Sequence, residues 1–136
     1  AETMAVVYCP RTHHFFGHPP YPLARMLAMN ISMALGTDSR ASNPDLSLFD
    51  EMRFVAQNHR QVKPSKILEL GTIAGARALG LDPQMGTLEP GKLANFAVVQ
   101  FGGDKADDPH ELLFAPSTRV VQTWLRGEIV QPAVIP

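Results

Sequence analysis

The stretch Ile31–Ser39 reads ISMALGTDS and indicates the fold class of the chain more clearly than any other segment. A short apolar run ends at Gly36, and three small polar residues follow directly. An apolar run that stops at such residues is typical of a buried β-strand. In α/β proteins the reactive groups lie at the carboxyl ends of parallel strands, so Asp38 is the first candidate for a functional side chain. The alternative is that its carboxylate only caps a turn or a helix.

The residues before this strand predict a second strand and a helix. The apolar run AVVYC at 5–9 ends at Pro10 and is typical of a short strand. Residues 11–21 are rich in His, Phe and Pro and predict a loop, and Pro22 suits the first turn of a helix over 22–29. Because strands alternate with helices here, we expect the two strands to lie parallel in βαβ units.

The first helix after the strand is expected to begin at Asp45 or Ser47. Five residues at helical spacing form one stripe of this helix, with Asp50 and Glu51 on the other side. The stripe consists of Leu46, Phe49, Met52, Arg53 and Ala56.

A further helix is predicted from Pro64 to Leu79, with Gly80 as the left-handed residue that ends it. Glycine inside a helix costs about 1 kcal/mol relative to alanine, so we expect a neighbouring element to pack closely against its small residues. These are Gly71, Gly75 and Ala78.

The last third of the chain changes to β-type patterns. The sequence EPGK at 89–92 predicts a type II turn, the apolar run at 96–101 predicts a strand, and 120–125 with 128–130 predict a hairpin around Gly127. The polar residues 102–109 between them predict a surface loop. This closing part is expected to form a separate antiparallel layer, in which Trp124 belongs to the core.

Composition narrows the classes of function. The chain has 136 residues, 45% of them apolar, and a formal net charge of −1, which fits one globular domain and disfavours nucleic acid or membrane surfaces as partners. The single cysteine, Cys9, excludes an intramolecular disulfide and favours a reducing, cytoplasmic location. No apolar stretch approaches the roughly 18 residues of a membrane span.

Histidine clusters early in the chain, at His13, His14 and His18. These side chains could form a small metal site, but Pro19 follows at once and disfavours a helical pairing of His14 with His18. We favour a loop with imidazoles that face substrate or solvent. His59 and His110 are expected at the surface.

Six short blocks in this order resemble the carboxyl-terminal third of the amidohydrolase superfamily, and most of all its deaminase and chlorohydrolase branch. The blocks are CPRTH at 9–13, ALGTDS at 34–39, ASN at 41–43, EMR at 51–53, TIAGARALG at 72–80 and GTLEPGK at 86–92. The resemblance implies an α/β fold: a partial (β/α)8 barrel, its last two βα units, in residues 1–82, followed by strands of a small β-sandwich in 83–136.

The resemblance also implies a site. Asp38 matches the aspartate after the eighth barrel strand, which ligates a divalent metal, zinc or alternatively iron, and acts as general base. His13 lies near the substrate, where many relatives carry Asn, and Ser39 and Asn43 match polar positions that support the aspartate and its loop. The implied reaction is hydrolytic deamination, or a related C–N or C–Cl hydrolysis, of a small nitrogen-containing heterocycle.

The chain lacks counterparts of the family's histidine ligands, and a complete barrel needs about 250 residues. We therefore expect this chain to be a truncated portion that is inactive by itself, and to associate with the missing amino-terminal part or with copies of itself. The alternative is a non-catalytic module that uses the open strand edges of a two-stranded sheet for oligomerisation.

Overall fold

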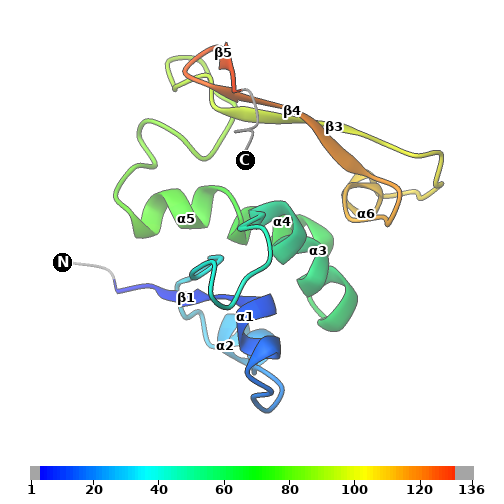
Figure 1. Cartoon of the computed structure of the whole chain (residues 1–136). Helices are drawn as coiled ribbons and strands as arrows, with labels where there is room; N and C mark the ends of the chain where they lie inside the picture. Colours follow the sequence, from blue (N-terminus) through cyan, green and yellow to red (C-terminus); the bar gives the residue numbers. More distant parts are fainter. Residues whose placement is uncertain (1–3, 131–136) are drawn as a thin grey trace.

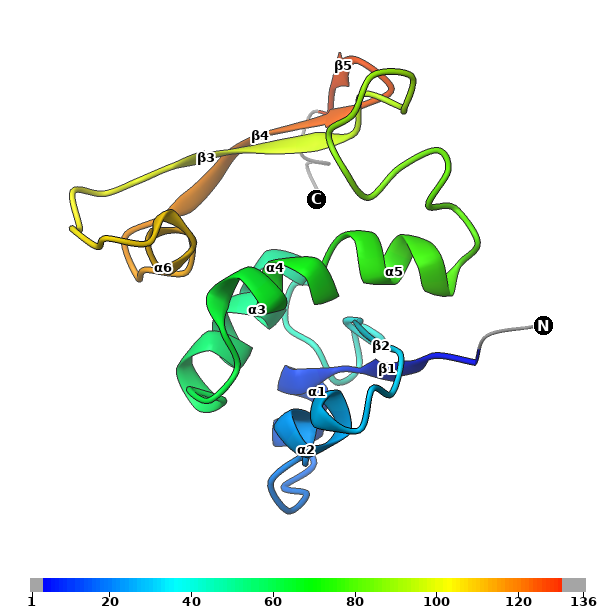
Figure 2. The ribbon, with the colours of Figure 1, turned by 180° about the vertical axis from the view of Figure 1, so that it is seen from behind.

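The computed structural model describes residues 4–130 and has a mixed α/β fold. Figures 1 and 2 show α3, α4 and α5 lying between a small parallel sheet and a longer antiparallel sheet. The elements in chain order are β1 (Val6–Tyr8), α1 (Pro10–Phe15), α2 (Leu23–Ala28), β2 (Met33–Leu35), α3 (Leu48–Asn58), α4 (Pro64–Leu70), α5 (Ile73–Ala78), β3 (Phe96–Gln100), α6 (Pro109–Leu113), β4 (Arg119–Leu125) and β5 (Glu128–Ile129).

The parallel arrangement of the first two strands is confirmed. β1 pairs with β2 in parallel, with Val7 opposite Ala34, and α1 and α2 make the crossover between them. The prediction of a loop over 11–21 is wrong in its first half, because α1 begins at Pro10. Proline lacks the N–H that the first helical turn leaves unpaired anyway, and its fixed φ suits that position.

The two faces of the parallel pair differ. Tyr8, Met33 and Leu35 point to one face and join the core formed with residues such as Ile67 of α4. On the other face Val7 is 56% exposed. A Cβ on Gly36 would come within 2.8 Å of the Val7 side chain, so a glycine keeps this face flat at the end of β2.

Helix α3 begins as expected, since the Ser47 hydroxyl accepts a hydrogen bond from the backbone N–H of Asp50. The polar side predicted for this helix is wrong at Glu51, which is completely buried.

The single helix predicted from 64 to 79 is in fact two. It breaks at Gly71 and Thr72, where the latter has φ −131° and ψ −97° outside the helical region. A Cβ on Gly71 would meet the side chain of Met52 in α3, which confirms the close approach there, whereas Gly75 faces open space. Gly80 has φ +69° and ends the second helix as predicted.

The antiparallel sheet has the order β3-β4-β5. The hairpin turn between β4 and β5 has positive φ at Arg126 and Gly127, and the turn at 89–92 is closed by the Lys92 N–H on the Glu89 carbonyl at 3.2 Å. Helix α6, capped by Asp108, was not predicted and follows the loop. No described helix is long and apolar enough to cross a membrane.

Candidate functional site

The site forms at the carboxyl ends of β1 and β2. Asp38 lies three residues after β2, its side chain is exposed, and its backbone has φ +59°. Aspartate adopts this left-handed conformation more readily than most residues, although it costs of order 1 kcal/mol or more. Cys9 follows β1, and the charge of Asp38 adds to burial in raising the pKa of its thiol.

Two buried hydroxyls connect Asp38 to the rest of the site. The Ser42 Oγ donates a hydrogen bond to Asp38 Oδ2 at 2.9 Å. The Thr12 Oγ1, from α1, lies 3.3 Å from Ser42 Oγ and 3.3 Å from the backbone carbonyl of Thr37. The loop after β2 is therefore joined to the helix after β1 directly beneath the carboxylate.

A second polar cluster holds the far end of the same loop. The Arg11 guanidinium donates to Glu51 Oε1 at 2.6 Å, to Asp45 Oδ1 at 2.5 Å and to Asn43 Oδ1 at 3.0 Å. The Asn43 Nδ2 in turn donates to Glu51 Oε1 at 2.6 Å. These partners hold the pKa of Arg11 above its usual range, chiefly through Asp45, and the Arg11 hydrogen bond lowers the pKa of Asp45.

The structure separates the residues that the resemblance grouped around Asp38. Ser39 contributes its backbone carbonyl, which accepts from the Ser42 N–H at 3.2 Å, while its own side chain is exposed. Asn43 joins the Arg11 and Glu51 cluster. Ser42 is the residue that touches the Asp38 carboxylate.

His13 lies in an aromatic cluster on the core side of α1. Its ring makes edge contacts with Tyr8 and Tyr21 and lies 5.1 Å, between ring centres, from His18. Burial and then the charge of His18 lower the pKa of His13.

The expectation that His59 lies at the surface is wrong. It is buried, and its Nε2 lies 3.3 Å from the Tyr8 hydroxyl. Burial, followed by the charge of His13, lowers the pKa of His59. Burial also raises the pKa of Tyr8 to about 12, with smaller contributions from Tyr21 and Glu51.

The described residues do not form a complete metal site at this end. Within 4–130, no three His, Cys, Asp or Glu side chains are close enough to share a metal ion. Asp38 by itself is an exposed carboxylate whose Oδ2 is occupied by Ser42.

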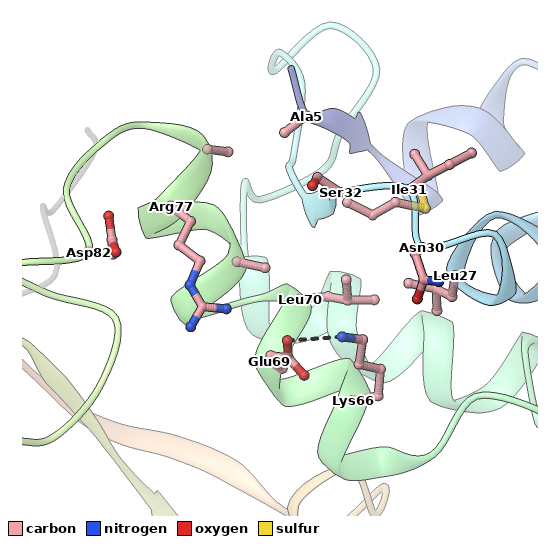
Figure 3. A pocket seen from close by; sticks show the side chains of 13 residues that line it. Ala5, Leu27, Asn30, Ile31, Ser32, Lys66, Glu69, Leu70, Arg77 and Asp82 are labelled. Atoms are coloured by element: carbon pink, nitrogen blue, oxygen red, sulfur yellow. Dashed lines mark hydrogen bonds and ion pairs between the residues drawn. The ribbon is translucent and has the colours of Figure 1, made fainter. Parts of the chain in front are cut away.

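The opposite, amino-terminal end of the two strands holds a hollow of about 460 Å³. Figure 3 shows Ala5 and Ser32, which precede the two strands, facing Lys66, Glu69 and Arg77 from the helices. The ion pair of Lys66 with Glu69, at 2.9 Å, is about 40% exposed on both sides (41% and 37%). Since reactive groups in α/β folds lie at the other end, this hollow is not the candidate site.

Three side chains that build the site were not predicted from the sequence: Thr12, Ser42 and Glu51. The first two stand inside the blocks CPRTH and ASN, so their positions were marked but not their roles. Glu51 stands inside the block EMR, but the helical pattern placed it on the side opposite the stripe, so its burial was not expected.

The sequence of this chain matches a known protein family and is similar to enzymes of known activity. Residues 2–130 match the sequence model of the amidohydrolase family. The chain is 30% identical over 135 residues to a 5-methylthioadenosine/S-adenosylhomocysteine deaminase of Teredinibacter turnerae, covering 90% of this chain and 30% of that enzyme. It is 33% identical over 98 residues to an S-triazine hydrolase of Gordonia rubripertincta, covering 67% of this chain and 20% of that enzyme.

A solved structure gives the same relationship. The fold is similar to that of an adenosine deaminase from Xanthomonas campestris with bound zinc, with a TM-score of 0.79 and 27% sequence identity. The match covers 92% of this chain and 31% of that one. The chain thus spans about a third or less of the length of these relatives.

Proposed function

Because the chain belongs to the amidohydrolase family, we propose that it forms the carboxyl-terminal part of a metal-dependent hydrolase. The proposed reaction is the hydrolytic removal of an amino or chloro group from a small nitrogen-containing heterocycle, a class supported by the deaminase and triazine hydrolase relatives. The observation that carries the proposal is Asp38: an exposed carboxylate after a parallel strand, with one oxygen held by a buried hydroxyl.

We propose that the chain consists of two structural units. Residues 1–82 would form the last two βα units of a (β/α)8 barrel, and residues 83–136 would supply strands of a β-sandwich. The parallel pair β1–β2 supports the first assignment, because its Tyr8 face packs against the helices, as the outer face of barrel strands does, while Val7 on the other face is 56% exposed. The antiparallel order β3-β4-β5 supports the second.

Asp38 fits a divalent metal as one ligand of several. A catalytic zinc takes about three protein ligands and keeps one position open, and carboxylate oxygen is among its ligands. Within residues 4–130 the donor to the Asp38 carboxylate is Ser42, on Oδ2, so Oδ1 is free to bind a cation. The remaining ligands would be histidines in the part of the protein that precedes this chain; iron would suit the same carboxylate.

We propose two roles for Asp38: it is a ligand of the metal, and it transfers a proton from the attacking water to the leaving group. A bound zinc ion lowers the pKa of its water to about 7. Asp38 accepts a proton from the attacking water at Oδ1 and later donates it to the leaving nitrogen. The water hydroxyl ends on the ring carbon, the carbon–nitrogen bond breaks, and ammonia leaves with the transferred proton.

The roles of the other predicted site residues are also proposals, and each is supported by a different observation. Ser39 is exposed beside Asp38 and is proposed to contact substrate. Asn43 is proposed to act through the loop, since it contacts Arg11 and Glu51. His13 lies in α1, the helix that follows β1 at the same end of the sheet as Asp38, and this supports a place near the substrate.

Association with further protein is part of the proposal. Within residues 4–130 both outer edges of the β1–β2 pair lack a partner strand, and unpaired edges favour association. The partner would be the amino-terminal part of the barrel or copies of this chain.

The same strand edges favour a second candidate function, a non-catalytic oligomerisation module. Sedimentation of the chain by itself tests self-association, which a monomer would contradict.

The experiment that tests the proposed function is a chimera. This chain replaces the aligned part of the Teredinibacter deaminase, and the deaminase without that part is the control. We expect the chimera to bind about one zinc per chain and to release ammonia from methylthioadenosine, and the control to do neither. A folded chimera that binds zinc but releases no ammonia above the control would contradict the proposal.

A further inference from the structure

We propose that Ser42 is a positioning residue for Asp38, and that Thr12 in turn orients Ser42. The role in catalysis rests on the proposed function of Asp38, but the positioning itself does not. The Ser42 hydroxyl holds Oδ2 at 2.9 Å, and the Thr12 hydroxyl lies 3.3 Å behind it. The pair fixes which carboxylate oxygen remains available.

The direction of the hydrogen bond between Ser42 and Asp38 follows from the number of protons. A serine hydroxyl has one proton to donate and lone pairs that accept. Because an ionised carboxylate can only accept, the Ser42 proton lies on Asp38 Oδ2. Thr12 also has a single proton to donate, and three acceptors lie within its reach: Ser42 Oγ and the Thr37 carbonyl, each at 3.3 Å, and the Ser42 carbonyl at 3.4 Å. Hydrogen bonds to a charged acceptor are the stronger kind, so the bond from Ser42 to Asp38 is the one that fixes the carboxylate. Thr12 holds Ser42 in place by its contacts with the Ser42 hydroxyl and carbonyl.

Burial makes this arrangement rigid. Thr12 and Ser42 are each only 7% exposed, so water competes little for their hydroxyls. The Ser42 backbone is fixed as well, because its N–H donates to the Ser39 carbonyl at 3.2 Å. An exposed carboxylate is thus held from below by two buried groups.

The backbone gives a second reason for a positioning group. Asp38 has φ +59° and Leu46 has φ +57°, so the loop that connects β2 to α3 holds two non-glycine residues in the left-handed region. Such conformations persist only where the surroundings impose them. Asn43 fixes the far end, where its Oδ1 accepts from the Leu46 N–H at 2.9 Å. Ser42 fixes the end that carries Asp38.

The consequence is a division of labour between the two oxygens. Oδ2 accepts the serine hydroxyl, whereas within residues 4–130 the structure gives Oδ1 no donor. Oδ1 is therefore the oxygen that would take a proton from water or bind a cation. Loss of the Ser42 hydroxyl would release the carboxylate from this hydrogen bond and let the Asp38 side chain occupy other χ1 rotamers.

The test measures the side-chain rotamer of Asp38 by NMR, from the three-bond couplings that report χ1. The wild-type chain should show one rotamer. Ser42→Ala should show a mixture, Ser42→Thr should restore the single rotamer because the hydroxyl returns, and Thr12→Val should show a smaller degree of mixing. Ser39→Ala is the matched control, since the Ser39 side chain is exposed and only its carbonyl contacts the loop.

A single Asp38 rotamer in Ser42→Ala would overturn the proposal, and so would equal mixing in Ser39→Ala. Dispersed amide signals from β3 and β4 check that each variant is folded. If Ser42→Ala does not fold, the wild-type chain decides: the Ser42 hydroxyl proton should exchange slowly with water, and fast exchange would contradict the assignment.

The outcome is separable from that of the proposed function. The rotamer and the hydroxyl exchange require neither metal nor substrate, so an inactive chimera leaves them unchanged. In an active chimera, Ser42→Ala should lower kcat about 10- to 100-fold with little change in KM, as expected for misplacement of a reacting group, and Ser42→Thr should recover it. An unchanged kcat would restrict Ser42 to a structural role and contradict positioning for the reaction.

Discussion

The two ends of the β1–β2 pair are built from similar residue types but in opposite ways. At the carboxyl end, Glu51 is fully buried and is bound by Arg11 and Asn43, and two buried hydroxyls support Asp38. At the amino end, Lys66 and Glu69 pair along one turn of α4 beside an open hollow and stay about 40% exposed (41% and 37%). Buried charges are costly unless every partner is in place, whereas exposed pairs contribute little either way. Precise side-chain geometry is therefore concentrated at the end that carries Asp38.

The largest expected difference between the two ends is in stability. Glu51→Ala leaves Arg11 and the Asn43 amide without their buried acceptor, and it should lower the free energy of unfolding by about 3–5 kcal/mol. Urea unfolding followed by circular dichroism measures it. Glu69→Ala, at the amino end, is the matched control, and equal losses for the two variants would contradict the contrast.

A smaller effect is expected at Asn43, which is buried and bridges the cluster. Asn43→Ala removes an acceptor for Arg11 and a donor to Glu51, and it should destabilise the chain by about 1–3 kcal/mol. Asn58→Ala removes only an exposed bond to the Phe54 carbonyl and should change stability by less than about 0.5 kcal/mol. The same urea experiment compares the two; an Asn43 loss no larger than that of Asn58 would show that the cluster does not anchor the loop.

Acidification should loosen the carboxyl end through His59. Burial lowers the pKa of His59 in the folded state, so the unfolded chain binds its proton more readily. The stabilising contribution is therefore complete above the unfolded pKa of about 6.5 and is lost as pH falls through the lower, folded pKa. Melting temperatures of the wild type and His59→Asn between pH 7.5 and 5 measure this, and the variant should show the shallower decline. Identical declines would contradict a buried neutral imidazole.

The smallest effect is expected at the amino end. Lys66→Ala removes one exposed pair with Glu69 and should change the free energy of unfolding by less than about 0.5 kcal/mol, less still at high salt. A loss above 1 kcal/mol would mean that the hollow is organised as tightly as the opposite end.

The sequence was informative where a local rule determines the structure. The apolar run before Gly36 predicted β2, the parallel pairing is confirmed, and the resemblance to the amidohydrolase family is confirmed by the family match. Gly80 marked a helix end correctly for the same reason, because few residues other than glycine adopt its φ of +69°.

Errors arose where tertiary contacts override local pattern. Glu51 looked like a solvent-facing residue because carboxylates are seldom buried. Its burial depends on Arg11, 40 residues away, and on Asn43, which both donate to it. His59 is buried for a comparable reason, through Tyr8. The break at Gly71 was read as helix interior, although the glycine also allows the approach of Met52. Ser42 stood in a recognised block, but no spacing rule tells which of two serines faces a carboxylate.

The measurement that tests the central assignment most directly is the rate of ammonia release by the chimera with Asp38→Asn. Asparagine tolerates the left-handed backbone of this position but cannot act as a general base, so kcat should fall by a factor of about 10² to 10⁴. Asp82→Asn, at the amino-end hollow, should leave the rate unchanged. A chimera with Asp38→Asn that releases ammonia at the unmodified rate would contradict the assignment of Asp38 as the functional carboxylate.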